Sequence, residues 1–286
     1  MRVRYEGGIL VQEALKEVIL DPARKTPGSV VSHGHMDHLT SGGIMTPQTV
    51  AVLKVRRGGT GQPLPYGKEI DLNGFRVVLK DAGHVFGSAM VRVDDLLYTG
   101  DFNPEGGATC GRAQPEFVRD LIVDATYGRP GYNFPPKHDV ESDLLNWLEM
   151  ELALGPVALG GYEFGKSQEL IALVNRLGVE VAVSDKIADL ADLYGAYGIQ
   201  LQYRRLSELA EGEQLVTLRE GGLLVALRSE VPDLEVLEHP DSPDDRAALD
   251  AVLLGGGLEA RDQVLPVGQF HDDAVPFLFC LHRLTV

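Results

Sequence analysis

The sequence predicts a mixed α/β (α+β) protein in which a strand-rich first part is followed by alternating strands and helices. Over the first 130 or so residues, short apolar runs are separated by turns that contain Gly and Pro, which is typical of strands. From about residue 140 the apolar spacing changes to every fourth position, which indicates a helix. The strands and helices that alternate after it indicate a small α/β unit inserted into the chain.

The strands expected in the first part are 30–31, 75–79, 90–93, 96–99 and 121–124. Two of them flank an Asp-Asp turn and predict a hairpin, and the last is expected to be buried. Residues that can carry chemistry follow these strands, and open sheets present active-site loops at the C-terminal ends of their strands.

The middle of the chain begins with a predicted helix whose apolar stripe is Val140, Leu144, Leu148 and Leu152. Strand 157–159, helix 167–177, strand 179–183, helix 187–194 and strand 223–227 follow. A strand at 234–237 leads to Ser242, an N-cap that starts a helix to about Leu254. We therefore expect a first domain built from 1–140 and 229–286, with 141–228 as the insertion.

The composition is that of a globular protein, because 44% of residues are hydrophobic and no run reaches the ~18 apolar residues of a membrane span. The start of the sequence lacks the apolar run of a signal peptide. Cys110 and Cys280 have no metal-binding spacing. We expect a cytoplasmic protein without membrane contacts.

The net charge of −16 disfavours nonspecific binding of nucleic acid, because phosphate contacts depend on Lys and Arg. Bound divalent cations would add positive charge at the site that holds them, where a polyanionic substrate would bind. The basic residues are clustered, at Lys54-Arg56-Arg57, Arg112, Arg119, Arg129, Lys137 and Arg204-Arg205.

Four potential metal ligands lie within six residues, directly after an apolar strand, in His33-Gly34-His35-Met36-Asp37-His38. In a tight turn, His33 and His35 can face one side while Asp37 and His38 face another. Imidazole and carboxylate donors suit zinc, with manganese or iron as weaker candidates. The alternative is a polar loop with scattered histidines.

Two later residues complete this ligand set. His84 follows a strand in Gly83-His84-Val85-Phe86-Gly87-Ser88-Ala89, and Asp101 follows the hairpin in Gly100-Asp101. We expect one ion at His33, His35 and His84, a second at Asp37 and His38, and Asp101 as the bridge between them. Such a pair of ions lowers the pKa of a bridging water and stabilises both oxygens of a displacement.

This order of motifs resembles the metallo-β-lactamase superfamily. Two further stretches, Asp124-Ala125-Thr126-Tyr127-Gly128 and Gly165-Lys166-Ser167-Gln168-Glu169-Leu170, are similar to motifs of its β-CASP nucleases, which include ribonuclease J and mRNA 3′-end processing nucleases. The resemblance implies a four-layer αββα sandwich with a small β-CASP-like insertion. It also implies two zinc ions and hydrolysis of phosphodiester bonds in RNA or DNA.

The resemblance also assigns roles to residues near the C-terminus. His239 matches a histidine that protonates the leaving oxygen, with Asp37 and Asp124 in the catalytic set, although His239 and Asp124 can equally be polar residues at strand ends. The last family ligand, a histidine, is replaced by Val267, as in β-CASP DNA nucleases. His271 is the alternative ligand.

Residues 160–167 also match the pattern of a nucleotide-binding P-loop, although no well-spaced Mg²⁺-binding aspartate follows. Under either interpretation, Lys166 and Ser167 at a helix start are candidate substrate contacts, or Lys166 is only solvated. The remaining alternatives are a small-molecule hydrolase acting on an ester, thioester or lactam, and a non-catalytic nucleic-acid-binding relative. Possible partners are a second copy of the chain or nucleic-acid-processing proteins.

Overall fold

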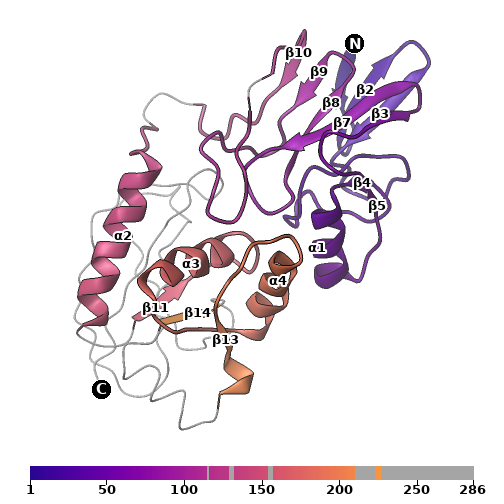
Figure 1. The fold of residues 1–286 in the computed structure, drawn as a ribbon. Coiled ribbons are helices and arrows are strands. Elements are labelled where there is room, and N and C mark those ends of the chain that lie inside the picture. Colours follow the sequence, from indigo (N-terminus) through magenta and orange to yellow (C-terminus); the bar gives the residue numbers. More distant parts are fainter. Residues whose placement is uncertain (115, 129–131, 154–156, 210–222, 227–286) are drawn as a thin grey trace, which may run out of the picture. The chain divides into compact units, whose positions relative to one another are not determined.

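The computed structural model describes residues 1–114, 116–128, 132–153, 157–209 and 223–226 (Figure 1). The chain divides into two compact units, Met1–Arg129 and Pro130–Val286. Both units contain helices and strands, so the predicted mixed α/β class is confirmed. The strand expected at 234–237 and the helix expected from Ser242 lie outside the described residues, and the division at residues 140 and 228 stays a prediction.

The first unit contains two groups of strands. The antiparallel sheet β1-β2-β3 consists of β1 (Arg2–Tyr5), β2 (Ile9–Glu13) and β3 (Lys16–Leu20). Single bridges through Val30 connect Leu20 to Ile44 of β4 (Ile44–Met45), which pairs with β5 (Gln62–Pro63). The second sheet has the order β10-β9-β8-β7-β6, with β6 (Glu69–Leu72), β7 (Phe75–Asp81), β8 (Ala89–Val93), β9 (Leu96–Tyr98) and β10 (Asp120–Ile122).

Both groups of strands contribute to one apolar core. Leu20, Val30 and Ile44 from the first group belong to the same cluster as Phe75 and Val77 of β7. Along β7 the apolar residues are buried and Arg76 is exposed, the alternation expected of a strand with one face on a core. This core holds the strand ends that lead into the candidate ligands.

The β8–β9 hairpin has the predicted position, and Asp94 in its turn takes a left-handed φ of 47°. The strand expected at 121–124 is present as β10, but the expectation that it is buried was wrong. Leu121 of β10 is 58% exposed, because β10 pairs only with β9 and forms the edge of its sheet.

The first unit also contains a helix that the strand pattern did not predict, α1 (Pro47–Arg57). The Thr46 side chain caps its N-terminus by accepting a hydrogen bond from the Thr49 N–H, and Pro47 occupies the first turn. Gly58 ends the helix with a left-handed φ of 59°. Thr-Pro at the start and Gly at the end are ordinary helix signals, and they were available in the sequence.

The second unit has a parallel sheet in the order β11-β14-β12-β13, formed by β11 (Val157–Gly160), β14 (Leu223–Ala226), β12 (Val181–Val183) and β13 (Arg204–Arg205). Its helices are α2 (Lys137–Leu152), α3 (Lys166–Val174) and α4 (Asp185–Gly195), with short 3-10 helices at Asn175–Leu177 and Leu206–Glu208. Parallel strands require such crossover connections. Val140, Leu144 and Leu148 are buried in its core, which confirms the predicted stripe.

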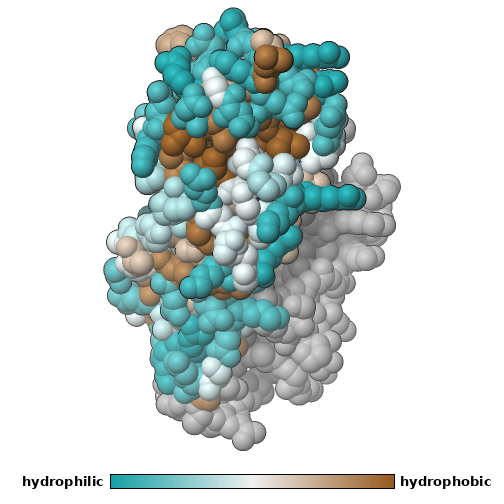
Figure 2. Space-filling view, turned by 90° about the vertical axis from the view of Figure 1, so that its right-hand side faces the viewer, coloured by the Kyte–Doolittle hydropathy of each residue, from teal (hydrophilic) through white to brown (hydrophobic). Residues whose placement is uncertain are grey.

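Within the described part of the chain, no helix is long and apolar enough to cross a membrane. Figure 2 shows one face of the molecule, on which groups of hydrophobic residues lie among hydrophilic ones.

Candidate metal centre

The candidate ligands of the first unit all follow the C-terminal ends of strands or extended segments. His33 comes after the Val30 bridge, His84 after β7 and Asp101 after β9. The parallel bridges and the shared core bring these ends together. This placement is the one that open sheets use to form sites.

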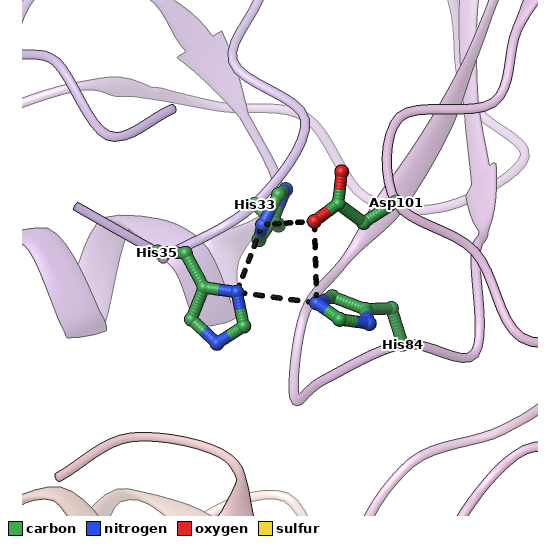
Figure 3. Close-up of side chains that lie close together, drawn as sticks. All are labelled: His33, His35, His84 and Asp101. Carbon is green, nitrogen blue, oxygen red and sulfur yellow. Dashed lines mark hydrogen bonds and ion pairs between the residues drawn. The ribbon is translucent and has the colours of Figure 1, made fainter. Parts of the chain in front are cut away.

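Four of the predicted ligands form one cluster, consisting of His33, His35, His84 and Asp101, and their side chains point toward one another in Figure 3. One ligand atom from each lies within 4.8 Å of the others. The His35 Nδ1 is 3.1 Å from the Nε2 atoms of both His33 and His84. The Asp101 Oδ2 is 3.6 Å from the same two Nε2 atoms.

The second predicted donor set lies on the other oxygen of Asp101. The His38 Nε2 is 3.6 Å from Asp101 Oδ1 and 3.5 Å from Asp37 Oδ2. The side chain of Asp37 is 77% exposed, so this second set is open to solvent on one side. The two oxygens of Asp101 thus face two separate groups of donors, the arrangement that a bridging carboxylate requires.

The electrostatics of the cluster favour neutral imidazoles. Burial, with the neighbouring histidines, lowers the pKa of His33 well below its usual value. Burial also lowers the pKa of His84 to about 3. A neutral imidazole has a free lone pair, so a cation binds there without first displacing a proton. The donor types and their protonation therefore fit a divalent metal such as zinc.

A buried carboxylate that the sequence analysis missed, Asp21, holds the second donor set. Its Oδ2 is 2.8 Å from the His38 Nδ1 and accepts hydrogen bonds from the hydroxyls of Ser32 (2.6 Å) and Tyr98 (2.9 Å). Burial alone would lower the pKa of His38, but the hydrogen bond and charge of Asp21 outweigh it and raise that pKa to about 9. The opposite ring nitrogen of His38 is thereby turned toward Asp101 and Asp37. Carboxylates commonly orient metal-binding histidines in this way.

We predict that Asp21→Asn lowers metal affinity or turnover by about 10- to 100-fold, because an amide lacks the charge that holds His38. The left-handed backbone of Asp21 (φ 44°) is one that Asn also adopts, so the change adds little strain. Metal titration and initial rates measure the effect. The matched control is Asp94→Asn, also left-handed but in the β8–β9 turn, which we expect to behave as the natural protein does. Natural metal content and rate in Asp21→Asn would contradict the assignment.

The turn that carries His84 is held by hydrogen bonds to the residues of its own motif. The Ser88 Oγ accepts hydrogen bonds from the N–H groups of His84 and Val85, both at 3.1 Å. The Gly87 carbonyl accepts hydrogen bonds from the hydroxyls of Thr46 (2.7 Å) and Thr49 (3.0 Å) at the start of α1. The Gly-His-x-x-Gly-Ser pattern is therefore a structural requirement of the ligand turn.

The other end of α1 holds the turn that carries His33 and His35. Arg56 Nη1 donates to the Gly34 carbonyl at 2.9 Å, and Arg57 Nη2 donates to the Met36 carbonyl at 3.0 Å. The unpredicted helix α1 thus fixes both ligand turns at once.

Gly83 precedes His84 at a point where a side chain has no room. A Cβ there would lie 2.4 Å from the Asn103 carbonyl oxygen, and φ is +67°. We predict that Gly83→Ala destabilises the protein well beyond the ~1–2 kcal/mol of left-handed strain and lowers metal content. The control is Gly67→Ala, where φ is +73° but no atom lies within 4 Å, so only the strain applies. Chemical denaturation compares the two, and equal losses would contradict the close-approach argument.

Of the remaining predicted residues, Asp124 follows β10 in the first unit, Lys166 and Ser167 belong to the second unit, and two lie outside the described residues. The Asp124 carboxylate accepts hydrogen bonds from the Thr126 N–H and hydroxyl after β10. In the second unit, the Lys166 Nζ lies 4.6 Å from the centre of the Tyr162 ring. The Ser167 hydroxyl is buried and donates to the Tyr162 carbonyl. His239 and His271 lie outside the described residues, and their roles stay predictions.

Comparisons with known proteins agree with the geometry of the site, although no protein-family model matches the chain. A probable DNA ligase of Opitutus terrae is 32% identical over 193 residues, which cover 64% of this chain and 19% of the ligase. A protein of Acidianus ambivalens, described only as lying in the lig 3′ region, is 33% identical over 145 residues, 48% of this chain and 99% of the relative. The human DNA cross-link repair 1A protein is 33% identical over 132 residues, 43% of this chain and 13% of the relative.

Further relatives are named as an RNase of Saccharolobus solfataricus and a transcription termination factor of a Lokiarchaeum. The chain belongs to the β-CASP group of the metallo-β-lactamase family. Its β-CASP relatives are metal-dependent, and the His/Asp cluster is where this chain can hold a metal. The chain spans less than a fifth of the length of the ligase and the repair protein.

Proposed function

We propose that this β-CASP chain is a metal-dependent nuclease that hydrolyses phosphodiester bonds with two zinc ions, or with manganese or iron in their place. The observation that carries the proposal is the cluster of His33, His35, His84 and Asp101, with the second donor set of His38 and Asp37 on the far oxygen of Asp101. The nuclease names among the relatives support it.

Divalent ions held at such a site supply an activated water and neutralise the charge that develops at phosphorus. The protein residues provide position and proton transfer. Asp101 faces both donor sets, and Asp21 keeps His38 oriented. His239 is the proposed proton donor to the leaving oxygen, with Asp124 as a residue that orients the donor or the second donor set.

DNA is the favoured substrate. The names of three relatives refer to a DNA ligase, to the region beside a lig gene and to DNA cross-link repair. Val267, which lies outside the described residues, also stands where β-CASP DNA nucleases carry valine. RNA is the second candidate, because one relative is named an RNase. Protein partners from nucleic-acid processing and a homo-oligomer belong to this proposal as well.

Two alternatives are less favoured by the structure. The parallel α/β unit that contains β11 to β14 supports a nuclease, because a small-molecule hydrolase of this fold has no need of the inserted unit. The complete set of four donors argues against a non-catalytic relative, which would have lost ligands. The four-layer αββα arrangement of the first domain is part of the proposal.

A nuclease assay with controlled metal content tests the proposal. Protein stripped with a chelator is expected to lose hydrolysis of end-labelled single-stranded and duplex DNA, and added Zn²⁺ or Mn²⁺ is expected to restore it. RNA of the same sequence tests the substrate preference. If metal-replete protein cleaved no polynucleotide but hydrolysed a lactam or a thioester, the small-molecule alternative would replace the nuclease.

A further inference from the structure

Several of the basic residues noted in the sequence are neutralised by carboxylates in the structure. The neutralised residues form the pairs Arg119–Asp120 (3.1 Å), Lys137–Glu169 (3.2 Å), Arg204–Glu180 (2.9 Å) and Arg205–Asp189 (2.8 Å). This is the expected outcome in a chain with 42 acidic and 26 basic residues. Basic side chains that escape neutralisation are therefore informative.

Lys54, Arg57 and Arg112 of the first unit are exposed and have no carboxylate partner among the residues that the structure describes. The same holds for Arg2, Arg24, Lys25 and Lys68, but the first three differ in where they lie. Lys54 and Arg57 lie in the last turn of α1. Cations are favoured at a helix C-terminus, which explains why the position tolerates them without a carboxylate.

Arg57 lies beside the turn that carries His33 and His35, and Lys54 lies one turn earlier on the same face of α1. The Arg57 hydrogen bond to the Met36 carbonyl anchors this end of α1 to the residue between His35 and Asp37. A guanidinium has five N–H donors in a planar fork, so one bond to a carbonyl leaves others for an anion. The hydrogen bond thus presents a positive charge next to the ligand turn.

Arg112 lies beside the other ligand turn. Its Cα is 2.6 Å from the position that a Cβ on Gly83 would take, and Gly83 directly precedes His84. The Ala113 N–H donates to the Asn103 carbonyl at 2.9 Å, and the Asn103 N–H donates to Ala82 at 2.8 Å, so the segment is fastened to the end of β7. The exposed side chain of Arg112 therefore starts from a fixed point next to His84.

We infer that Lys54, Arg57 and Arg112 form the surface that binds the phosphodiester backbone of the substrate strand beside the metal centre. The inference rests on the proposed nuclease function and adds where the polynucleotide is held. It also gives this acidic protein a place to bind a polyanion, because Arg57 and Arg112 lie next to the two turns that carry the ligands. The ligand bound by this surface is a phosphodiester backbone, which DNA and RNA share. The test therefore measures both polynucleotides.

The test measures the salt dependence of strand binding. A fluorescently labelled single-stranded oligonucleotide with phosphorothioate linkages, as DNA and as RNA, is titrated with metal-replete protein between about 50 and 200 mM salt. Each charge-removing substitution among Lys54→Gln, Arg57→Gln and Arg112→Gln is expected to weaken binding and to flatten the log–log slope by about 0.7. The triple variant should lose about 2 in slope. The lower Kd of the natural protein at a fixed salt concentration identifies whether DNA or RNA is bound more tightly.

The matched control is Arg2→Gln, an exposed basic residue on β1. Arg2 aligns with Gln12 and Glu17, at the opposite end of its sheet from Leu20, which leads into Asp21. Its substitution should leave the slope unchanged. Because Arg57 also anchors the ligand turn, the double variant Lys54→Gln, Arg112→Gln is measured too, with metal analysis of each protein.

Two outcomes would overturn the inference: a triple variant with the natural slope, or an Arg2→Gln variant that loses as much as the others. In either case the natural protein still cleaves polynucleotides, so the proposed function stands. Absence of cleavage by the natural protein would instead refute the proposed function.

Discussion

Replacing Asp101 or His35 with Ala is expected to abolish hydrolysis and to remove at least one of two divalent ions from each chain. Asp101 faces both donor sets, so its loss takes a ligand from each. The His35 Nδ1 lies 3.1 Å from the Nε2 atoms of both His33 and His84, so its loss removes the central donor of the first set. Elemental analysis of purified protein and a nuclease assay measure the two effects together.

The control for these variants is His138→Ala, because the side chain of His138 is 80% exposed and lies on α2 next to its neighbour Asp139. It is expected to keep natural metal content and rate. Anomalous scattering from metal-replete crystals provides the direct test, and the absence of an ion beside His33, His84 and Asp101 would refute the metal centre. A single ion would show that Val267, in place of the usual histidine, leaves the second set too weak.

Replacing His239 with Ala is expected to lower turnover by about two to four orders of magnitude while metal content stays natural. The reason is the role that the family resemblance implies, protonation of the leaving oxygen, which a histidine can perform near neutral pH. The contrast with His35→Ala is decisive, because a ligand variant loses metal and a proton-donor variant does not.

A second measurement strengthens the His239 test. A substrate whose leaving group is a stable anion, such as a nitrophenolate, needs little protonation, so the His239→Ala variant should lose less rate on it than on DNA. Equal losses on both substrates would contradict a proton-donor role. Loss of metal in the variant would reassign His239 to the ligand set.

The ligand set could be predicted because its signal is local. His33, His35, Asp37 and His38 lie within six residues, and one tight turn determines how they are presented. His84 and Asp101 each follow a strand with a clear apolar pattern, so their place at a sheet end also followed from the sequence. Helices α2, α3 and α4 of the second unit were predicted for the same reason, since the periodicity of residues such as Val140 and Leu144 is local.

Other features depended on partners that are distant in the sequence. Asp21 has no motif of its own, and its role comes from Ser32, His38 and Tyr98, which are 11, 17 and 77 residues away. The exposure of Leu121 depends on β10 lying at the edge of its sheet, which a single strand's apolar pattern does not encode. The sequence contained local capping signals for helix α1, but no local signal indicated what the helix does. Only the fold shows that its two ends hold both ligand turns.

The sequence by itself predicted the family, the mixed α/β class and the candidate metal donors, because short-range spacing and strand periodicity carry that information. The tertiary structure alone decided how the donors are oriented and which basic residues of the described chain remain unneutralised. Lys137 and Arg57 are alike in sequence as members of basic clusters, yet one is paired with Glu169 and the other lies beside the ligand turn. The physical reason is that ion pairs, and the hydrogen bonds that orient the donors, form between segments that are distant in the sequence and that only the folded core brings together.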